Sequence, residues 1–230
     1  MNSKVYHLEE LNIALSANDP RRVMPIVSGE HKRILDVGCG AGQTLIASHL
    51  SPDVVAVGVD RDFAALHLGK QLGTHIHFVC AAGERLPFVS GCFDLVISRV
   101  SLPYMHIPKA LAEIARVIKP CGNLWIVLHP FPMVWRELVH SFRKLNVVDV
   151  LFRLYVLANG LAFHIASKQF RFPFGRHRCE SFQTGRGISR ALYAAGFADI
   201  EIRRERFFVV SAKKWSVGQL TPVPTGVSPS

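Results

Sequence analysis

The chain has 230 residues, of which 49% are hydrophobic, so it is long and apolar enough to form one α/β domain with a large core. Its formal net charge of +10 and its sequence pI near 9.7 favour an anionic partner, namely an acidic small molecule, a membrane surface or a nucleic acid. The five cysteines are scattered, with no C-x-x-C pair and no His/Cys cluster at zinc-ligand spacing, which argues against a disulfide framework or a metal site and predicts a reduced, cytoplasmic protein.

The first segment is predicted to form a short amphipathic helix. Apolar residues recur among polar ones over residues 4–17, and Asp19-Pro20 ends the pattern. The first ten residues have neither the basic region nor the apolar core of a signal peptide, so we expect no secretion.

The central motif spans residues 33–45 and reads R-I-L-D-V-G-C-G-A-G-Q-T-L. Its apolar start suits a buried parallel strand, and the alternating glycines that follow allow a tight turn into a helix, where the backbone approaches a ligand closely. Dinucleotide sites use G-x-G-x-x-G, whereas Gln43 stands here in the place of the third glycine. Asp36 lies just before the turn, where its carboxylate would repel a pyrophosphate but attract a cation. The motif therefore favours a cationic nucleoside over a dinucleotide.

A second acidic residue follows the next predicted strand. Residues 54–59 form an apolar run that ends at Asp60, eighteen positions after Gly42. A carboxylate in this place accepts hydrogen bonds from both hydroxyls of a ribose, each worth roughly 1.5 to 3 kcal/mol. Because both cofactor classes use this arrangement, Asp60 predicts a ribose without distinguishing between them.

The rest of the first half alternates between helical and strand patterns. The predicted elements are helices over 44–50, 63–72 and 107–118, strands over 75–80 and 123–128, and a turn followed by a strand within 91–98. Asp62 is the predicted cap of the second of these helices. Such alternation predicts a parallel sheet with helices on its faces.

Three runs resemble class I S-adenosylmethionine-dependent methyltransferases, in the small-molecule branch that includes methyltransferase domain 11 and ubiquinone-biosynthesis-like enzymes. They are D-V-G-C-G-A-G at 36–42, E-R-L-P-F at 84–88 and G-C-F-D-L-V at 91–96. The resemblance covers residues 30–129 well and 184–214 moderately. It implies an α/β fold with a Rossmann-like, seven-stranded, mostly parallel sheet whose last strand is antiparallel, and S-adenosyl-L-methionine as the cofactor.

The resemblance also implies a set of cofactor-binding residues. They are Asp36, Gly38, Cys39, Gly40, Gly42, Asp60, Arg61, Ala82, Gly83, Glu84 and Arg99. Ala82 departs from the family pattern, because an aspartate in this place usually binds the adenine amino group. Loss of that hydrogen-bond acceptor should weaken adenine binding by about 1 to 3 kcal/mol if nothing replaces it. In similar enzymes the N-terminal segment often folds over the cofactor, so Tyr6 and His7 either cover it or simply pack against the domain.

The acceptor is expected at the carboxyl ends of the strands, where ligands of open α/β sheets bind. Ser101 and Tyr104 are the predicted acceptor contacts, together with Arg176 from a later basic segment. For a protonated acceptor, His129 or His106 is the predicted general base, because imidazole is suitably basic near neutral pH, although each could equally be a packing residue. The absence of N-P-P-Y and of Pro-Cys at this edge argues against methylation of nucleic-acid bases by those mechanisms.

Residues 130–183 match no family pattern. Their apolar periodicity predicts a largely helical cap inserted after the fifth strand, over the acceptor pocket. Asp149 and Arg153 interrupt the apolar stretch 147–165, so we expect no transmembrane segment, while peripheral membrane contact stays open. Aromatic and basic residues alternate over 169–178, which suits either a flat anionic ligand or a solvated basic loop.

The chain then returns to the family pattern, with a helix over 188–195 and strands over 196–202 and 207–212. We expect one domain over residues 1–214 and a disordered tail over 215–230, which is rich in proline and small residues.

The predicted function is methyl transfer from S-adenosyl-L-methionine to O, N or C of a small, partly apolar or anionic acceptor. Two alternatives stay open. The positive charge suggests an RNA-directed methyltransferase, and Ala82 together with the lack of an obvious base suggests a catalytically inactive binding or assembly factor. The sequence identifies neither the acceptor nor the oligomeric state.

Overall fold

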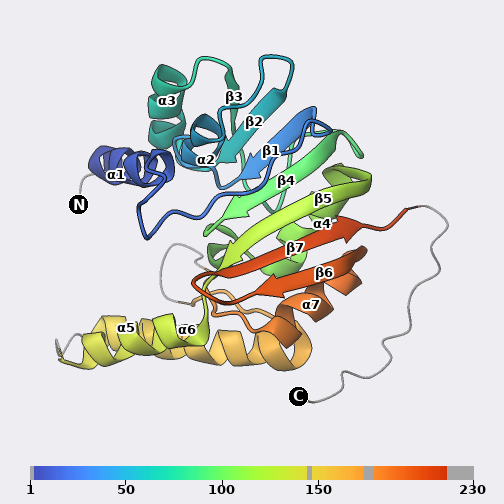
Figure 1. The fold of residues 1–230 in the computed structure, drawn as a ribbon. Coiled ribbons are helices and arrows are strands. Elements are labelled where there is room, and N and C mark those ends of the chain that lie inside the picture. Colours follow the sequence, from blue (N-terminus) through green and yellow to red (C-terminus); the bar gives the residue numbers. More distant parts are fainter. Residues whose placement is uncertain (1–2, 144–146, 174–178, 217–230) are drawn as a thin grey trace.

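The computed structural model describes residues 3–143, 147–173 and 179–216, and the structural statements below concern these residues. One sheet crosses the molecule (Figure 1). Its strands are β1 Arg33–Val37, β2 Val55–Asp60, β3 Ile76–Cys80, β4 Phe93–Arg99, β5 Ile118–Leu128, β6 Phe197–Arg203 and β7 Phe208–Lys214. The predicted tail lies, from residue 217 on, outside the described residues.

The strand order is β3-β2-β1-β4-β5-β7-β6. Strands β1 to β5 pair in parallel, and β7 is antiparallel to both of its neighbours, β5 and β6. This topology confirms the predicted seven-stranded, mostly parallel sheet with an antiparallel last strand.

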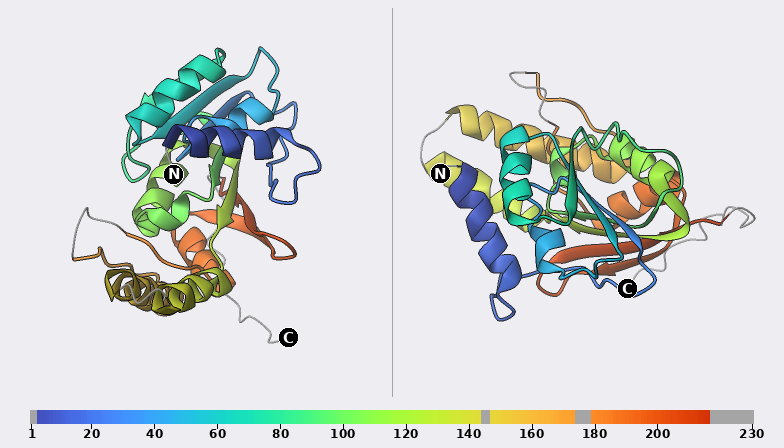
Figure 2. Two further views of the ribbon diagram at one scale, coloured as in Figure 1. Left: turned by 90° about the vertical axis from the view of Figure 1, so that its left-hand side faces the viewer. Right: turned by 90° about the horizontal axis from the view of Figure 1, so that it is seen from above.

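Helices cover the sheet and extend beyond one end of it (Figures 1 and 2). They are α1 Ser3–Leu15, α2 Gln43–Ala47, α3 Phe63–Leu72, the short 3-10 helix η1 Leu102–Tyr104, α4 Ile107–Val117, α5 Phe131–Arg143, α6 Val147–Ala166 and α7 Gly185–Ala194. The predicted cap of α3 is confirmed, because the Asp62 carboxylate accepts from the backbone N–H groups of Ala64 and Ala65.

Strand β1 supplies side chains to a separate core on each face of the sheet. Leu35 and Val37 pack in the cluster that includes the apolar residues of α4 and α7, whereas Ile34 packs in the cluster that includes Leu45 of α2. Successive side chains of a strand point to opposite faces, so burial of β1 on both faces explains why Ile34 and the adjacent Leu35 are both apolar.

Strand β5 begins earlier than predicted. We expected a turn over 119–122 and a strand from 123, but β5 starts at Ile118, directly after α4. Its pairing with β4 shifts register between Phe93 and Leu95, and Cys121 adopts a positive φ of 62°. The predicted turn residues therefore form an irregular part of the strand rather than a separate loop.

The predicted helical insertion after the fifth strand is present as the α5–α6 hairpin. The two helices lie side by side at the end of the molecule opposite α3 (Figures 1 and 2), and α6 also contacts α7. Val134, Phe152, Val156 and Phe182 form a small core of their own beneath the hairpin.

Candidate functional site

The glycine turn between β1 and α2 is shaped by three left-handed residues. Gly38, Gly40 and Gly42 have φ values of 76°, 56° and 77°, a conformation that costs glycine little and other residues more. A Cβ atom on Gly38 would lie 2.2 Å from the Cβ atom of Ser101. The backbone N–H groups of residues 38 and 39 both donate to the Val59 carbonyl, at 2.7 and 3.0 Å. The turn is thus fixed against the end of β2, with no room for a side chain at its first glycine.

Asp60 ends β2 and lies beside this turn. Its Oδ2 atom accepts a hydrogen bond from the Gly40 N–H at 2.8 Å, and its Oδ1 atom accepts one from the Asp62 N–H at 2.9 Å. Two backbone donors therefore orient the carboxylate, and each oxygen retains further lone-pair capacity for ligand hydroxyls.

A cavity of about 220 Å³ opens where four successive strands end. Its lining residues lie at or after the carboxyl ends of β1, β2, β3 and β4 and are Gly38, Val59, Asp60, Arg61, Ala81, Gly83, Ser101, Tyr104 and Met105. The cavity thus brings together four predicted cofactor residues and two predicted acceptor residues. Sequence reasoning missed Val59, Ala81 and Met105, because an apolar lining residue carries no motif of its own.

Asp36 is buried beneath the turn. Its side chain is 1% exposed, and its Oδ1 atom has no hydrogen-bond partner among the described residues. Burial raises the pKa of this carboxyl to about 7, with the nearby Asp60 adding to the rise and the Arg99 guanidinium opposing it. A buried carboxylate with one oxygen that lacks a hydrogen-bond partner fits a site built to receive a cationic group.

Arg99 lies at the end of β4 but does not line the cavity. Its Nη2 atom donates to Glu10 Oε2 of α1 at 3.0 Å, and its Nε atom donates to Thr44 Oγ1 of α2 at 3.1 Å. Arg99 therefore links the N-terminal helix to the helix that follows the glycine turn.

Helix α1 packs over the glycine turn. His7 is buried, its Nδ1 atom lies 2.9 Å from Gln43 Nε2, and its ring lies against Gly40. Tyr6 stays half-exposed beside it, with the two rings in an edge-to-face contact. His7 thus packs against the turn itself, which the sequence had left undecided.

Three other predicted cofactor residues lie in the surrounding loops with their side chains outside the cavity lining. The Cys39 thiol is buried against Gly58, and burial raises its pKa. Glu84 Oε1 accepts from the His106 N–H at 3.0 Å, and Ala82 forms a turn by accepting from the Arg85 N–H.

The two predicted acceptor contacts at this edge, Ser101 and Tyr104, differ in their contacts with the rest of the protein. Ser101 Oγ donates to the Val37 carbonyl at 2.6 Å and lies 2.8 Å from Ser98 Oγ, so it joins η1 to β1. Tyr104 is half-exposed, and its ring meets the ring of His129 edge-on, with the centroids 5.1 Å apart. Arg176, the third predicted contact, lies outside the described residues.

The two predicted bases also differ. His106 caps α4, because its Nδ1 atom accepts from the Lys109 N–H, and burial lowers its pKa. His129 is buried, and its Nε2 atom has no hydrogen-bond partner among the described residues. Burial, assisted by the positive charge of Arg153, lowers the pKa of His129 to about 4. His129 is therefore neutral near pH 7 and lies next to the cavity through its contact with Tyr104.

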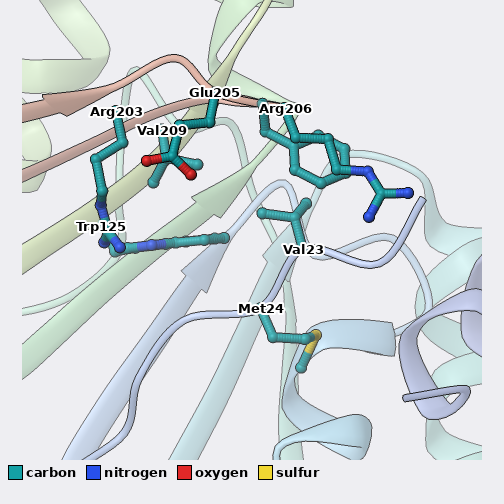
Figure 3. A pocket seen from close by; sticks show the side chains of 8 residues that line it. Val23, Met24, Trp125, Arg203, Glu205, Arg206 and Val209 are labelled. Atoms are coloured by element: carbon teal, nitrogen blue, oxygen red, sulfur yellow. The ribbon is translucent and has the colours of Figure 1, made fainter. Parts of the chain in front are cut away.

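A second pocket of about 160 Å³ lies near the β6–β7 turn (Figure 3). Trp125, Arg203, Glu205 and Arg206 are among the residues that line this second pocket. None of its lining residues belongs to the glycine turn or to the cavity at the ends of β1 to β4. No group of three or more His, Cys, Asp or Glu side chains that could hold a metal ion was found within the described ranges.

The sequence profile of the family described as methyltransferase domain matches residues 35–126, which include the end of β1, the glycine turn, Asp60 and β4. Residues 35–126 therefore carry a methyltransferase domain, and the fold is that of S-adenosylmethionine-dependent methyltransferases. The domain and its fold imply S-adenosylmethionine as the cofactor.

Known proteins resemble this methyltransferase domain over part of their length. The mouse mitochondrial protein named arginine-hydroxylase NDUFAF5 is 42% identical over 91 residues, which are 38% of this chain and 26% of that protein. The demethylmenaquinone methyltransferase of Renibacterium salmoninarum is 33% identical over 113 residues, which are 46% of this chain and 47% of that enzyme. The chain thus matches less than half the length of either relative.

The fold is shared with solved methyltransferase structures. An S-adenosylmethionine-dependent methyltransferase from Thermotoga maritima, described as a possible histamine N-methyltransferase, superimposes with a TM-score of 0.55. The match covers 92% of this chain and 90% of that one at 16% sequence identity, so the likeness concerns the fold alone.

Proposed function

We propose that the chain transfers a methyl group from S-adenosylmethionine to a small, partly apolar acceptor that binds beside Tyr104 and His129. The observation that carries the proposal is the cavity at the ends of β1 to β4, bordered by the glycine turn and Asp60. When bound, the cofactor supplies a methyl group on a positively charged sulfur, and this charge suits a site that holds two carboxylates.

The residues of the turn would hold the nucleoside. A Cβ atom on Gly38 would lie 2.2 Å from Ser101 Cβ, and one on Gly83 would lie 2.6 Å from Met105 Sδ, so a side chain at either position would displace a residue that lines the cavity. Asp60 is oriented to accept from the ribose hydroxyls. Asp36 is the buried carboxylate that an ammonium group would neutralise, after a movement of α1 or the turn that admits it.

Tyr104 and His129 would orient the acceptor. In-line displacement at a methyl group depends chiefly on alignment and on exclusion of water. A pKa of about 4 makes His129 a weak proton acceptor at neutral pH, so its free Nε2 atom favours a hydrogen bond to the acceptor over full proton removal.

Calorimetry with S-adenosylmethionine and S-adenosylhomocysteine tests cofactor binding. We expect saturable binding of both by the full chain, and absence of heat at millimolar cofactor would refute the proposal. Incubation of the chain with methyl-labelled cofactor and, in separate reactions, fractionated small-molecule extracts or total RNA then tests transfer. Label that enters only RNA, with binding that weakens steeply as salt rises, would support the RNA-directed alternative.

Hydroxylation of an arginine side chain is a second candidate, supported by the name of the NDUFAF5 relative over 91 residues. Mass spectrometry of arginine-containing peptides distinguishes the two reactions after incubation with S-adenosylmethionine, dioxygen and a two-electron reductant, because such a hydroxylation puts one oxygen atom of dioxygen into a C–H bond and reduces the other to water. A mass gain of one oxygen atom would favour hydroxylation, and a gain of one methylene group would favour methyl transfer.

A further inference from the structure

The α5–α6 hairpin exposes an unusual amount of apolar surface. Six large apolar residues of α6 are between 45% and 73% exposed, namely Val147, Val148, Leu151, Leu154, Leu161 and Ile165. On α5 the aromatic residues Phe131, Trp135 and Phe142 are 44%, 51% and 53% exposed. Exposed apolar groups that gather in this way mark an interaction surface rather than ordinary surface variation.

The exposed residues of α6 form a stripe opposite its buried side. At 3.6 residues per turn, Leu151, Leu154 and Leu161 fall on one side, whereas Phe152 and Val156 fall on the side that packs in the hairpin core. A helix of 20 residues is about 30 Å long. By length and composition α6 resembles a membrane-crossing helix, yet only 28% of its most apolar window is buried in the protein. The residues of the stripe therefore do not contribute to the hydrophobic core of the protein.

Contacts on the buried side hold α6 against the domain. Arg153 forms ion pairs with Glu137 of α5 at 2.7 Å and with Glu180 at 3.3 Å. Asn159 is buried, and its amide donates to the Glu180 carbonyl at 2.8 Å and accepts from the Phe170 N–H at 2.7 Å. A crossing orientation would break these bonds in hydrocarbon, so the geometry fits a helix that lies flat on an interface.

The charge around the hairpin is complementary to an anionic surface. Residues 131–172 include six Lys or Arg residues against two Asp or Glu residues. Arg136 and Arg143 are exposed on α5, and Lys168 and Arg171 are exposed just after α6. Pairing with a second copy would bring these like charges together, whereas anionic lipid headgroups attract them.

We propose that the α5–α6 hairpin docks on an anionic membrane surface, with the exposed stripe of α6 at the boundary between headgroups and acyl chains. Helix α5 begins two residues after His129, so docking brings the Tyr104–His129 edge close to the lipid. An acceptor dissolved in the membrane would then reach this edge. Docking on the membrane needs no cofactor, so membrane binding can be tested independently of the proposed methyl transfer.

Vesicle sedimentation of the full chain tests the proposal. We expect the protein to sediment with vesicles of phosphatidylcholine and phosphatidylglycerol, and more weakly with phosphatidylcholine alone. The double variant Leu154→Glu/Leu161→Glu should lower the binding constant at least tenfold. The matched control is Ile26→Glu/Val89→Glu, which changes two residues that are 81% and 75% exposed elsewhere and should leave binding unchanged.

Wild-type protein that stays in the supernatant with anionic vesicles would overturn the proposal, as would stripe and control variants that lose binding equally. Light scattering after size-exclusion chromatography tests the other occupant. A wild-type dimer that the stripe variant converts to a monomer, without vesicle binding, would assign the surface to a second copy.

Trp135 gives a measurement that needs no charged variant. Phosphatidylcholine brominated on its acyl chains, mixed with phosphatidylglycerol, should quench tryptophan emission of the wild type, and Trp135→Phe should remove that quenching. The other two tryptophans lie in the domain: Trp125 is buried, and Trp215 follows β7 with its Nε1 atom buried, so both should stay unquenched in both proteins. Equal quenching of wild type and variant would contradict insertion of the hairpin.

Discussion

Replacement of Asp36 by asparagine should stabilise the cofactor-free protein while weakening cofactor binding. Asp36 is fully buried, and its pKa of about 7 lies above the ordinary value of 3.8 because the folded state disfavours its charge. The difference corresponds to about 4 kcal/mol, as an upper bound, once the group is ionised in both states.

The pH dependence follows from the sign of this difference. A carboxyl whose pKa is raised on folding costs nothing at a pH below its unfolded value, and the cost grows as pH rises and is complete above about pH 7. Asp36→Asn should therefore raise the free energy of unfolding by up to about 4 kcal/mol near pH 8, less any cost of an unpaired amide, and by little near pH 4.

Urea unfolding of wild type and variant across this pH range measures the effect, and calorimetry with S-adenosylmethionine measures the loss of affinity. Asp53→Asn is the control, because the Lys32 ammonium lowers the pKa of exposed Asp53 to about 2, and its removal should not stabilise the protein at high pH. An Asp36→Asn protein that is less stable than wild type near pH 8 and near pH 4 alike would refute the reasoning, since it would mean that the charged carboxylate has a partner.

Three further substitutions test the site. Gly38→Ala should lower stability by roughly 1 to 3 kcal/mol and abolish cofactor binding, because its Cβ atom would meet Ser101. Gly91→Ala is the control, because Gly91 also has a positive φ but faces open space, so this variant should retain binding. Equal cofactor affinities of the two variants in calorimetry would contradict the prediction. Asp60→Ala should weaken S-adenosylmethionine binding at least tenfold by removing charge-assisted hydrogen bonds, while Asp62→Ala should cost only about 1 kcal/mol of helix-cap stability, as thermal unfolding would reveal. The wild type should lose about 3 kcal/mol of unfolding free energy as pH falls from about 6.5 to 4, because burial opposes protonation of His129 in the folded protein, and His129→Phe should not show this loss. A wild-type free energy of unfolding that stays constant across this pH range in urea unfolding would contradict the prediction.

The sequence predicted those parts of the fold that depend on neighbouring residues. Helix α3 begins and ends where its pattern does, at Phe63 and Leu72, because Asp62 caps it locally. The glycine turn and Asp60 were recognisable because their spacing follows directly from a strand, a tight turn and a second strand.

What the sequence could not predict depends on contacts between distant residues. Arg99 meets Glu10 across 89 positions, so the motif that suggested a cofactor contact could not reveal a link to α1. Met105 enters the cavity because η1 folds back toward Gly83, and no periodicity reports that approach. The early start of β5 likewise reflects pairing with β4 rather than a local turn preference.

The two-sided burial of β1 has an evolutionary consequence. A single inserted residue before Asp36 would exchange the side chains that Ile34 and Leu35 send to their separate cores, and would misplace the turn at the same time. Selection for folding alone therefore preserves this strand and its spacing to the glycines, even in a descendant that no longer turns over substrate. An intact glycine motif is thus evidence for the fold alone. Evidence that the protein turns over a substrate has to come from the less constrained residues around Tyr104 and His129.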